Sequence, residues 1–127
     1  MKETKKAKKT VAIPSAEGGE TSISIEAIKQ MAGSVAMECF GIVGMASVSM
    51  KDGLVRLLKR DSMTKGVGID IREGEIFVTF HIVAAYGVSI LAVSQNLVET
   101  ISYQLEEFTG MKVRHVTIYV EGVRPVD

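Results

Sequence analysis

The chain has 127 residues, which is enough for one hydrophobic core and too few for two domains of ordinary size. Hydrophobic residues make up 46% and charged residues 24%, which is typical of a globular fold rather than of a disordered chain. The formal net charge is zero, and the single cysteine excludes an intramolecular disulfide framework and is typical of the reducing cytoplasm.

The zero net charge hides an uneven distribution along the chain. Residues 1–10 contain five lysines and one glutamate, a net charge of +4, so residues 11–127 together carry −4. The favoured interpretation is a solvated, flexible basic tail that keeps the protein soluble. The alternative is electrostatic contact with an anionic surface such as a membrane, which salt would weaken. The lysines concerned are Lys2, Lys5, Lys6, Lys8 and Lys9.

The folded body is predicted to begin near Thr21. Pro14 and the pair Gly18-Gly19 interrupt any regular element and favour a linker over residues 13–20. We therefore predict a basic tail and linker at residues 1–20 and a single domain at residues 21–127.

Neither a membrane span nor a secretory signal is indicated by the hydropathy pattern. The most apolar run covers residues 82–93, and its 12 residues fall well below the ~20 needed to cross a bilayer. The basic start is followed by three apolar residues at 11–13, whereas a signal peptide needs roughly 7–15. These patterns predict a cytoplasmic protein, with any membrane association peripheral and through a partner.

A helix and a strand are the first elements predicted in the domain. Ser24 is a candidate N-cap for a helix over residues 25–39, in which apolar side chains recur at helical spacing on one face. Gly41 ends this helix because glycine readily adopts the left-handed conformation. Residues 42–50 then predict a buried strand.

The segment after this strand is predicted to be a short helix. Leu54, Leu57 and Leu58 have helical spacing within residues 52–60, which favours a helix over a strand. A brief additional strand is expected around Ile23.

Residues 66–87 predict a β-hairpin. Hydrophobic and polar residues alternate on both sides of Glu73-Gly74, which is a candidate two-residue turn. If Arg72 faces Glu75, one face of the hairpin becomes wholly apolar, and a slip by one residue would destroy that agreement. The apolar pairs of this register are Ile71 with Ile76, Ile69 with Val78, and Val67 with Phe80.

The longest helix is predicted at residues 89–109, and Gly110 ends it. A last strand follows over residues 113–123. The predicted fold is therefore α+β, a small sheet that includes the central hairpin and the C-terminal strand, with two main amphipathic helices on one face. The apolar stripe of the long helix comprises Ile90, Val93, Leu97, Ile101, Leu105 and Phe108.

Gly41 and Gly44 form a GxxG spacing, which in the KH domain marks the loop that clamps the nucleic-acid backbone. Here Ile42 and Val43 lie between the glycines and provide no charge or polar group for a phosphate. The negative charge of residues 11–127 also opposes a polyanion. We interpret Gly41 and Gly44 as a structural turn, so that nucleic-acid binding, if any, would depend on the basic tail.

Four short segments carry a family resemblance: GIVGMA at 41–46, KGV at 65–67, YG at 86–87 and VTIYVEGV at 116–123. Together they resemble the alkaline-shock or general-stress protein family of Gram-positive bacteria, over residues 21–123. The resemblance implies a small, non-enzymatic cytoplasmic protein tied to stress or envelope homeostasis, held near the membrane by a partner in some members. These motifs are structural rather than catalytic.

Motifs of nucleophilic, phosphate-binding and zinc-dependent enzymes, such as GxSxG, GxxxxGK[ST], HExxH and CxxC, do not occur in the sequence. Cys39 could be a nucleophile with His81 or His115 as its base, but it lies on the apolar face of its predicted helix. The two histidines could join Cys39 or Glu121 around zinc, but their spacing is not that of a chelating motif. We therefore predict no catalytic, cofactor-binding or metal-binding residues.

The leading hypothesis is a non-enzymatic scaffold or adaptor for stress and envelope homeostasis that works through protein contacts. Its partners would be proteins, membrane-anchored in some settings, or further copies of the chain. The alternatives are an accessory subunit of a metabolic enzyme, such as a kinase acting on lipid precursors, and a nucleic-acid-binding module. The predicted interaction surface is the second face of the hairpin and last strand: Phe77, Thr79, His81, Val83, His115, Thr117 and Tyr119. In the competing interpretation, residues 52–60 cover Phe77 and Val83.

Overall fold

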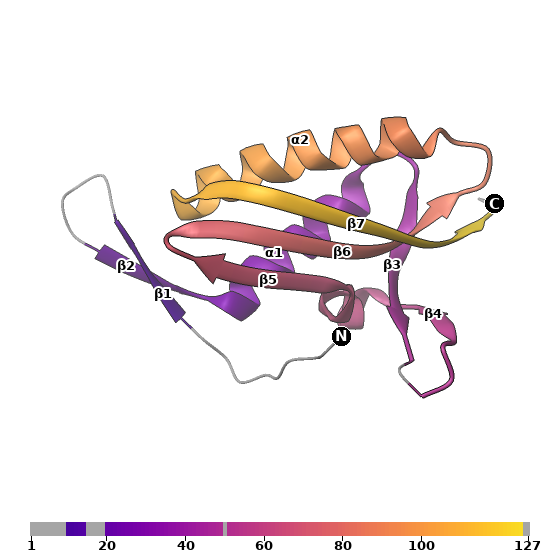
Figure 1. Ribbon diagram of the computed structural model, residues 1–127, viewed down its shortest axis with the longest axis horizontal. Coiled ribbons are helices and arrows are strands. Elements are labelled where there is room, and N and C mark those ends of the chain that lie inside the picture. Colours follow the sequence, from indigo (N-terminus) through magenta and orange to yellow (C-terminus); the bar gives the residue numbers. More distant parts are fainter. Residues whose placement is uncertain (1–9, 15–19, 50, 126–127) are drawn as a thin grey trace.

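Two helices cover one face of a mixed sheet in the computed structural model, which describes residues 10–14, 20–49 and 51–125 (Figure 1). The α+β prediction is confirmed. The elements are β1 (Thr10–Pro14), β2 (Glu20–Ser24), α1 (Ile25–Glu38), β3 (Ile42–Val48), β4 (Val55–Leu57), the 3₁₀ helix η1 (Arg60–Gly66), β5 (Val67–Arg72), β6 (Glu75–Ala85), α2 (Ile90–Thr109) and β7 (Lys112–Arg124).

Strand β6 lies at the centre of the five-stranded sheet β4-β3-β6-β5, with β7 as the further strand. On one side of β6, β5 pairs antiparallel with its first half and β3 with its second half. On the other side, β7 runs parallel to β6 along its whole length. Strands β6 and β7 run along the long axis of the molecule (Figure 1).

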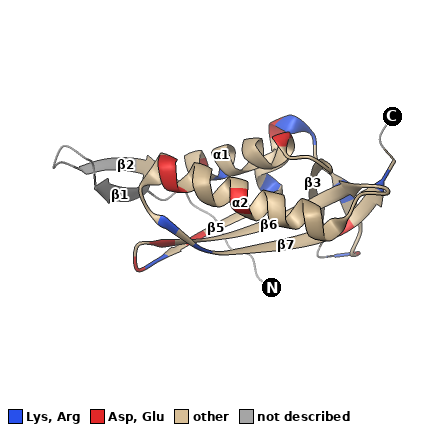
Figure 2. Cartoon of the chain, turned by 90° about the horizontal axis from the view of Figure 1, so that it is seen from above, with Lys and Arg blue, Asp and Glu red and all other residues tan. Residues whose placement is uncertain are grey.

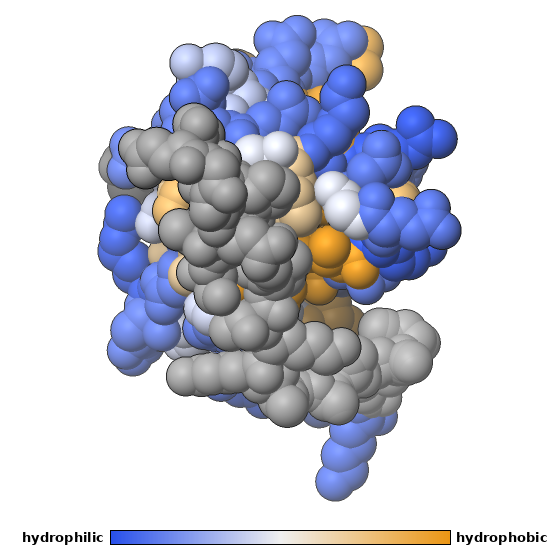
Figure 3. Space-filling view, turned by 90° about the vertical axis from the view of Figure 1, so that its left-hand side faces the viewer, coloured by the Kyte–Doolittle hydropathy of each residue, from blue (hydrophilic) through white to orange (hydrophobic). Residues whose placement is uncertain are grey.

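Helices α1 and α2 lie side by side on the same face of this sheet (Figure 2). The β6 side chains that face the helices are 0–1% exposed, and these are Ile76, Val78, Phe80 and Ile82. The predicted stripe of α2 provides most of its buried residues, although its ends, Ile90 and Phe108, are 39% and 41% exposed. Around the β5–β6 turn the described surface is mostly hydrophilic, with a small hydrophobic area (Figure 3).

The β5–β6 hairpin has the predicted register. Arg72 is opposite Glu75, and the three predicted apolar pairs are all formed. Glu73 and Gly74 have φ angles of +54° and +77°, as a type I′ turn requires. The right-handed twist of this turn matches that of the strands, which explains why so short a connection is stable.

Capping residues mark the helix boundaries, as predicted for Ser24 at the start of α1 and Gly110 at the end of α2. The Ser24 hydroxyl accepts a hydrogen bond from the Ala27 N–H at 3.0 Å, and the Ser89 hydroxyl accepts one from the Ala92 N–H at 3.1 Å. These bonds satisfy backbone donors that have no partner within the helix. Gly110 ends α2 with a φ of +77°.

The prediction of a short helix at residues 52–60 is wrong. Val55–Leu57 is strand β4, which pairs antiparallel with β3. Leu54 and Leu57 are 55% and 38% exposed, so they do not form the buried face that would stabilise a helix. The helical turn comes later, in η1, whose Met63 packs against Gly33 of α1.

The N-terminal region contains regular structure at both ends of the predicted linker, residues 13–20. Strands β1 and β2 pair antiparallel as a two-stranded sheet, with Thr10 opposite Ser24 and Pro14 opposite Glu20. The strand expected around Ile23 is thereby confirmed. The predicted basic tail, including Lys2, Lys5, Lys6, Lys8 and Lys9, lies outside the described residues.

Candidate functional site

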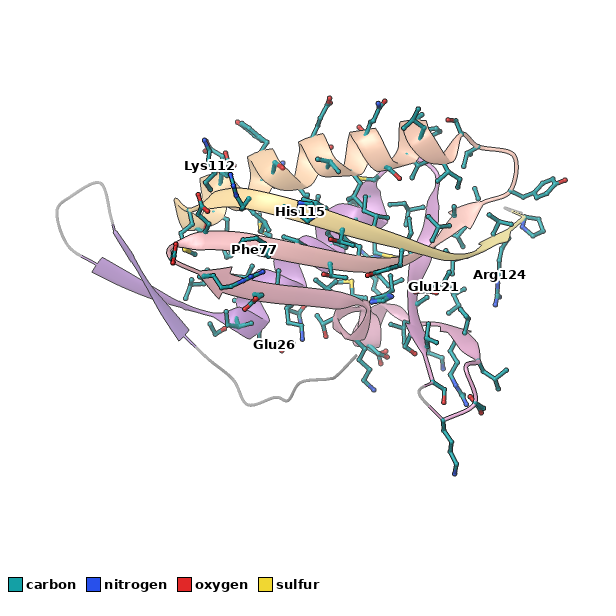
Figure 4. The ribbon with its side chains drawn as sticks, viewed as in Figure 1. Glu26, Phe77, Lys112, His115, Glu121 and Arg124 are labelled. Atoms are coloured by element: carbon teal, nitrogen blue, oxygen red, sulfur yellow. The ribbon has the colours of Figure 1, made fainter. Side chains whose placement is uncertain are left out.

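The face of the sheet opposite the helices, here called the open face, carries six of the predicted interaction residues. The β6–β7 register places them in three neighbouring pairs: Phe77 with His115, Thr79 with Thr117, and His81 with Tyr119. Phe77 and His115 lie on adjacent strands at the front of the sheet (Figure 4). Two strands far apart in the sequence thus contribute to one surface.

His81 is the centre of a small cluster on this face. Its Nδ1 atom lies 2.6 Å from Glu121 Oε2, and its ring stacks on Tyr119 with centroids 4.9 Å apart and an interplanar angle of 14°. Glu121 can reach His81 because the β6–β7 register shifts beside it, between Ile82 and Val83 of β6. The carboxylate therefore orients the imidazole and holds the two strands together on the open face.

Phe77 is covered by its own hairpin rather than by residues 52–60. The Arg72 guanidinium carbon lies 3.9 Å from the centre of the Phe77 ring, and Arg72 Nε is 2.9 Å from Asp70 Oδ2. The cation lies over the negative face of the ring, which is a favourable arrangement. Phe77 remains half-buried, with an arginine beside it on the exposed side.

Val83 does not belong to the exposed surface, which corrects the predicted set. It is 1% exposed and pairs with Gly44 of β3. Leu57 Cδ1 lies 3.0 Å from where a Cβ at Gly44 would stand, so β4 covers this part of the open face. The competing interpretation therefore holds for the surroundings of Val83 and not for Phe77.

A second feature is an open cavity of about 320 Å³ between α1 and α2. Its lining residues are Ser34, Val35, Glu38, Cys39, Phe40, Asn96, Thr100 and Gln104. Burial raises the pKa of the Cys39 thiol, and the charge of Glu38 adds to this, while the Thr100 hydroxyl opposes it. A raised pKa leaves little of the thiolate that a cysteine nucleophile needs.

Cys39 is expected to react more slowly with iodoacetamide than free cysteine does at neutral pH. Its pKa is raised, so the rate should keep increasing with pH beyond the range in which an ordinary thiol has already ionised. The measurement is the alkylation rate of the folded protein against pH, followed by mass spectrometry. A rate that reaches its plateau below the ordinary thiol pKa would contradict this account.

The histidines lie apart from each other. His115 pairs with Phe77, four residues from His81 along β6, which separates them by roughly 13 Å. Within residues 10–14, 20–49 and 51–125, no three His, Cys, Asp or Glu side chains are grouped as metal ligands would be.

Gly41 lies in the turn between α1 and β3, Gly44 lies within β3, and the two positions differ in what they require. Gly41 has a φ of +82°, and a Cβ there would lie 2.4 Å from Val93 Cγ2. Gly44 lies within β3, where the nearest atom is the end of the exposed Leu57 side chain. The GxxG spacing therefore contains one glycine that the backbone demands and one that allows close packing.

Comparison with known proteins places this arrangement in a family. The model of the alkaline shock protein 23 family, which is described as having a cell envelope-related function, matches residues 14–125. The chain belongs to this alkaline-shock family. The resemblance seen in the sequence is thereby confirmed.

Three relatives of this alkaline-shock-family chain cover most of its length. It is 37% identical over 107 residues to the uncharacterized protein YloU of Bacillus subtilis, covering 84% of this chain and 89% of YloU. It is 36% identical over 109 residues to the uncharacterized protein Spy1614 of Streptococcus pyogenes, covering 85% and 90%. The uncharacterized protein YqhY of B. subtilis is 27% identical over 106 residues, covering 84% and 78%. No solved structure matches the alkaline-shock-family chain.

None of the helices in the described part of this alkaline-shock-family chain has the length and apolar character needed to cross a bilayer.

Proposed function

We propose that this protein is a non-enzymatic cytoplasmic scaffold or adaptor in cell-envelope maintenance, and that it binds protein partners through the open face of its sheet. The description of the family supports the envelope setting. The observation that carries the proposal is the open face itself, where the strand register brings aromatic and histidine residues together on the side of the sheet away from the helices.

The composition of the open face favours protein recognition. Tyr119 is 51% exposed, and Phe77 lies under Arg72. Aromatic residues and arginine are the side chains that most often dominate the binding free energy of protein interfaces. The His81–Glu121 contact and the strand pairing hold this surface rigid, so little conformational entropy is lost when a partner binds.

The decisive experiment is affinity purification from the native host under gentle detergent, comparing the wild-type chain with Phe77→Ser. We expect Phe77→Ser to weaken partner capture by about 2 kcal/mol, because it removes an aromatic anchor of the open face. Phe40→Ser is the matched control, since Phe40 is 58% exposed on the helix side. Tyr119→Lys is a second open-face variant.

Circular dichroism establishes that each variant is folded before capture is compared. Full capture by folded Phe77→Ser and Tyr119→Lys would eliminate the open face as the interaction surface. The identity of the captured partner also distinguishes two roles. Capture of an envelope protein would support the scaffold role, whereas capture of a metabolic enzyme such as a lipid-precursor kinase would support the role of an accessory subunit.

A further inference from the structure

Strand β7 presents a long free edge. It has 13 residues, contains no proline, and among the described residues it pairs with β6 alone. Its other edge lies along the rim of the sheet below α2 (Figure 1). Unpaired backbone donors and acceptors on such an edge are a template for a further strand.

The residues of β7 are arranged nearly symmetrically about Ile118. Valines lie two and five residues away on both sides, at Val116 and Val120 and at Val113 and Val123. We propose that β7 pairs antiparallel with β7 of a second copy of this chain, with Ile118 opposite Ile118 on the twofold axis. This inference is independent of the partner proposed for the open face.

The faces of the sheet select this register. Residues opposite each other in an antiparallel pair must lie on the same face. Centring on Ile118 places Val116 opposite Val120 and Val113 opposite Val123. All four valines pair with β6 residues on the helix side or its continuation, namely Ile76, Val78, Ile82 and Ala84. The apolar layer under the helices would thus continue across the interface.

Neighbouring registers do not preserve the faces. Centring on Tyr119 would place Val116 opposite Gly122, which pairs with the open-face residue Val83. Centring on Thr117 would place Val113 opposite Glu121, whose carboxylate contacts His81 on the open face. A shift of the centre by half a residue would exchange the two faces altogether.

Polar side chains are also compatible with pairing between two copies. In the proposed register His115 of one copy lies opposite Glu121 of the other, and the symmetry forms this pair twice. The like-charged Lys112 and Arg124 meet only at the two ends, where both are exposed and screened by solvent. At the start of β7 the Val113 N–H already donates to Glu106 Oε2 at 3.0 Å. The backbone hydrogen bonds between the two copies would therefore be formed by residues 115–121.

Exposed apolar residues beside the edge extend the same interface. Val123 is 51% exposed and would be covered by Val113 of the second copy. On α2, Leu91 and Val98 are 68% and 36% exposed. They lie roughly 140–180° around the helix from Thr100 and Asn96, which face α1 across the cavity. This flank of α2 adjoins the β7 edge, so a second copy would bury it, whereas an isolated strand would not.

The oligomeric state tests the proposal. Sedimentation equilibrium of the full chain should show a monomer–dimer equilibrium, with Val123→Asp raising the dimer dissociation constant about tenfold or more, because it buries an unpaired carboxylate. Leu54→Asp is the matched control, since Leu54 is 55% exposed in the β3–β4 connection. Phe77→Ser should leave the equilibrium unchanged, which separates this interface from the open-face site.

Single cysteines test the register. Ile118→Cys should form a covalent dimer under mild oxidation, because only the central residue faces its own copy within the Cα separation of about 4.4–6.8 Å that a disulfide needs. Thr117→Cys and Tyr119→Cys should crosslink far less. The wild-type chain treated identically controls for the buried Cys39.

Three results would overturn the proposal. They are a wild-type chain that stays monomeric at concentrations on the order of 100 μM, equal effects of Val123→Asp and Leu54→Asp, and crosslinking that is absent at residue 118 or stronger at residue 117 or 119. A monomeric chain that instead binds an extended peptide along β7 would assign the edge to another protein.

Discussion

Gly41→Ala is expected to lower the free energy of unfolding by about 3 kcal/mol, because two costs coincide at this position. Gly41 has a φ of +82°, a conformation that is unfavourable for a residue with a Cβ atom. The added Cβ would also lie 2.4 Å from Val93 Cγ2, so α2 would have to move away from the turn between α1 and β3. Urea denaturation followed by circular dichroism measures the loss.

Gly44→Ala is the matched control for this prediction. Gly44 has an ordinary strand conformation, and its new Cβ would meet the flexible, 38% exposed Leu57 side chain at 3.0 Å. We expect a loss of about 1 kcal/mol or less, because that side chain can rotate into solvent. Equal losses at both positions would contradict the distinction drawn between the two glycines of the GxxG spacing.

The elements that sequence patterns predict correctly are those governed by local chemistry. The β5–β6 register depends on alternation over a few residues and on the Glu73-Gly74 turn, and both signals lie within the hairpin itself. The starts of α1 and α2 depend on Ser24 and Ser89, which bond to backbone groups three residues away. No distant contact is needed to specify any of these features.

Elements that depend on distant contacts are not predicted by such patterns. Leu54 and Leu57 have helical spacing, yet residues 55–57 pair with β3, because a neighbouring strand satisfies their backbone groups. The parallel pairing of β6 with β7 joins segments separated by α2, and local patterns do not specify that register. These two pairings decide the shape of both faces of the sheet.

On the open face, too, the locally specified features are predicted and those that depend on distant contacts are not. Period-two alternation correctly assigns Phe77, Thr79 and His81 to one face of β6 and His115, Thr117 and Tyr119 to one face of β7. Val83 is buried because β3 and β4 cover it, and the alternation within β6 does not indicate where those two strands lie. The His81–Glu121 contact needs the register shift near the end of β7, which no turn residue indicates.

Leu97→Ala is expected to lower the free energy of unfolding by about 2–5 kcal/mol, because it leaves a cavity between α2 and the sheet. Leu97 is 0% exposed and belongs to the main hydrophobic core. Thermal or urea denaturation of dilute protein measures the loss, at concentrations where self-association does not contribute to stability.

Leu91→Ala is the control on the same helix, since Leu91 is 68% exposed. In dilute protein the same substitution should change stability by no more than about 0.5 kcal/mol, because an exposed leucine gains little from folding. At concentrations where β7 edges pair, Leu91→Ala should instead weaken the dimer, because its side chain would then be buried. In dilute protein, Leu91→Ala could lower the free energy of unfolding as much as Leu97→Ala does. That result would show that the outer flank of α2 is already buried in the monomer, and this flank could then not belong to the proposed interface.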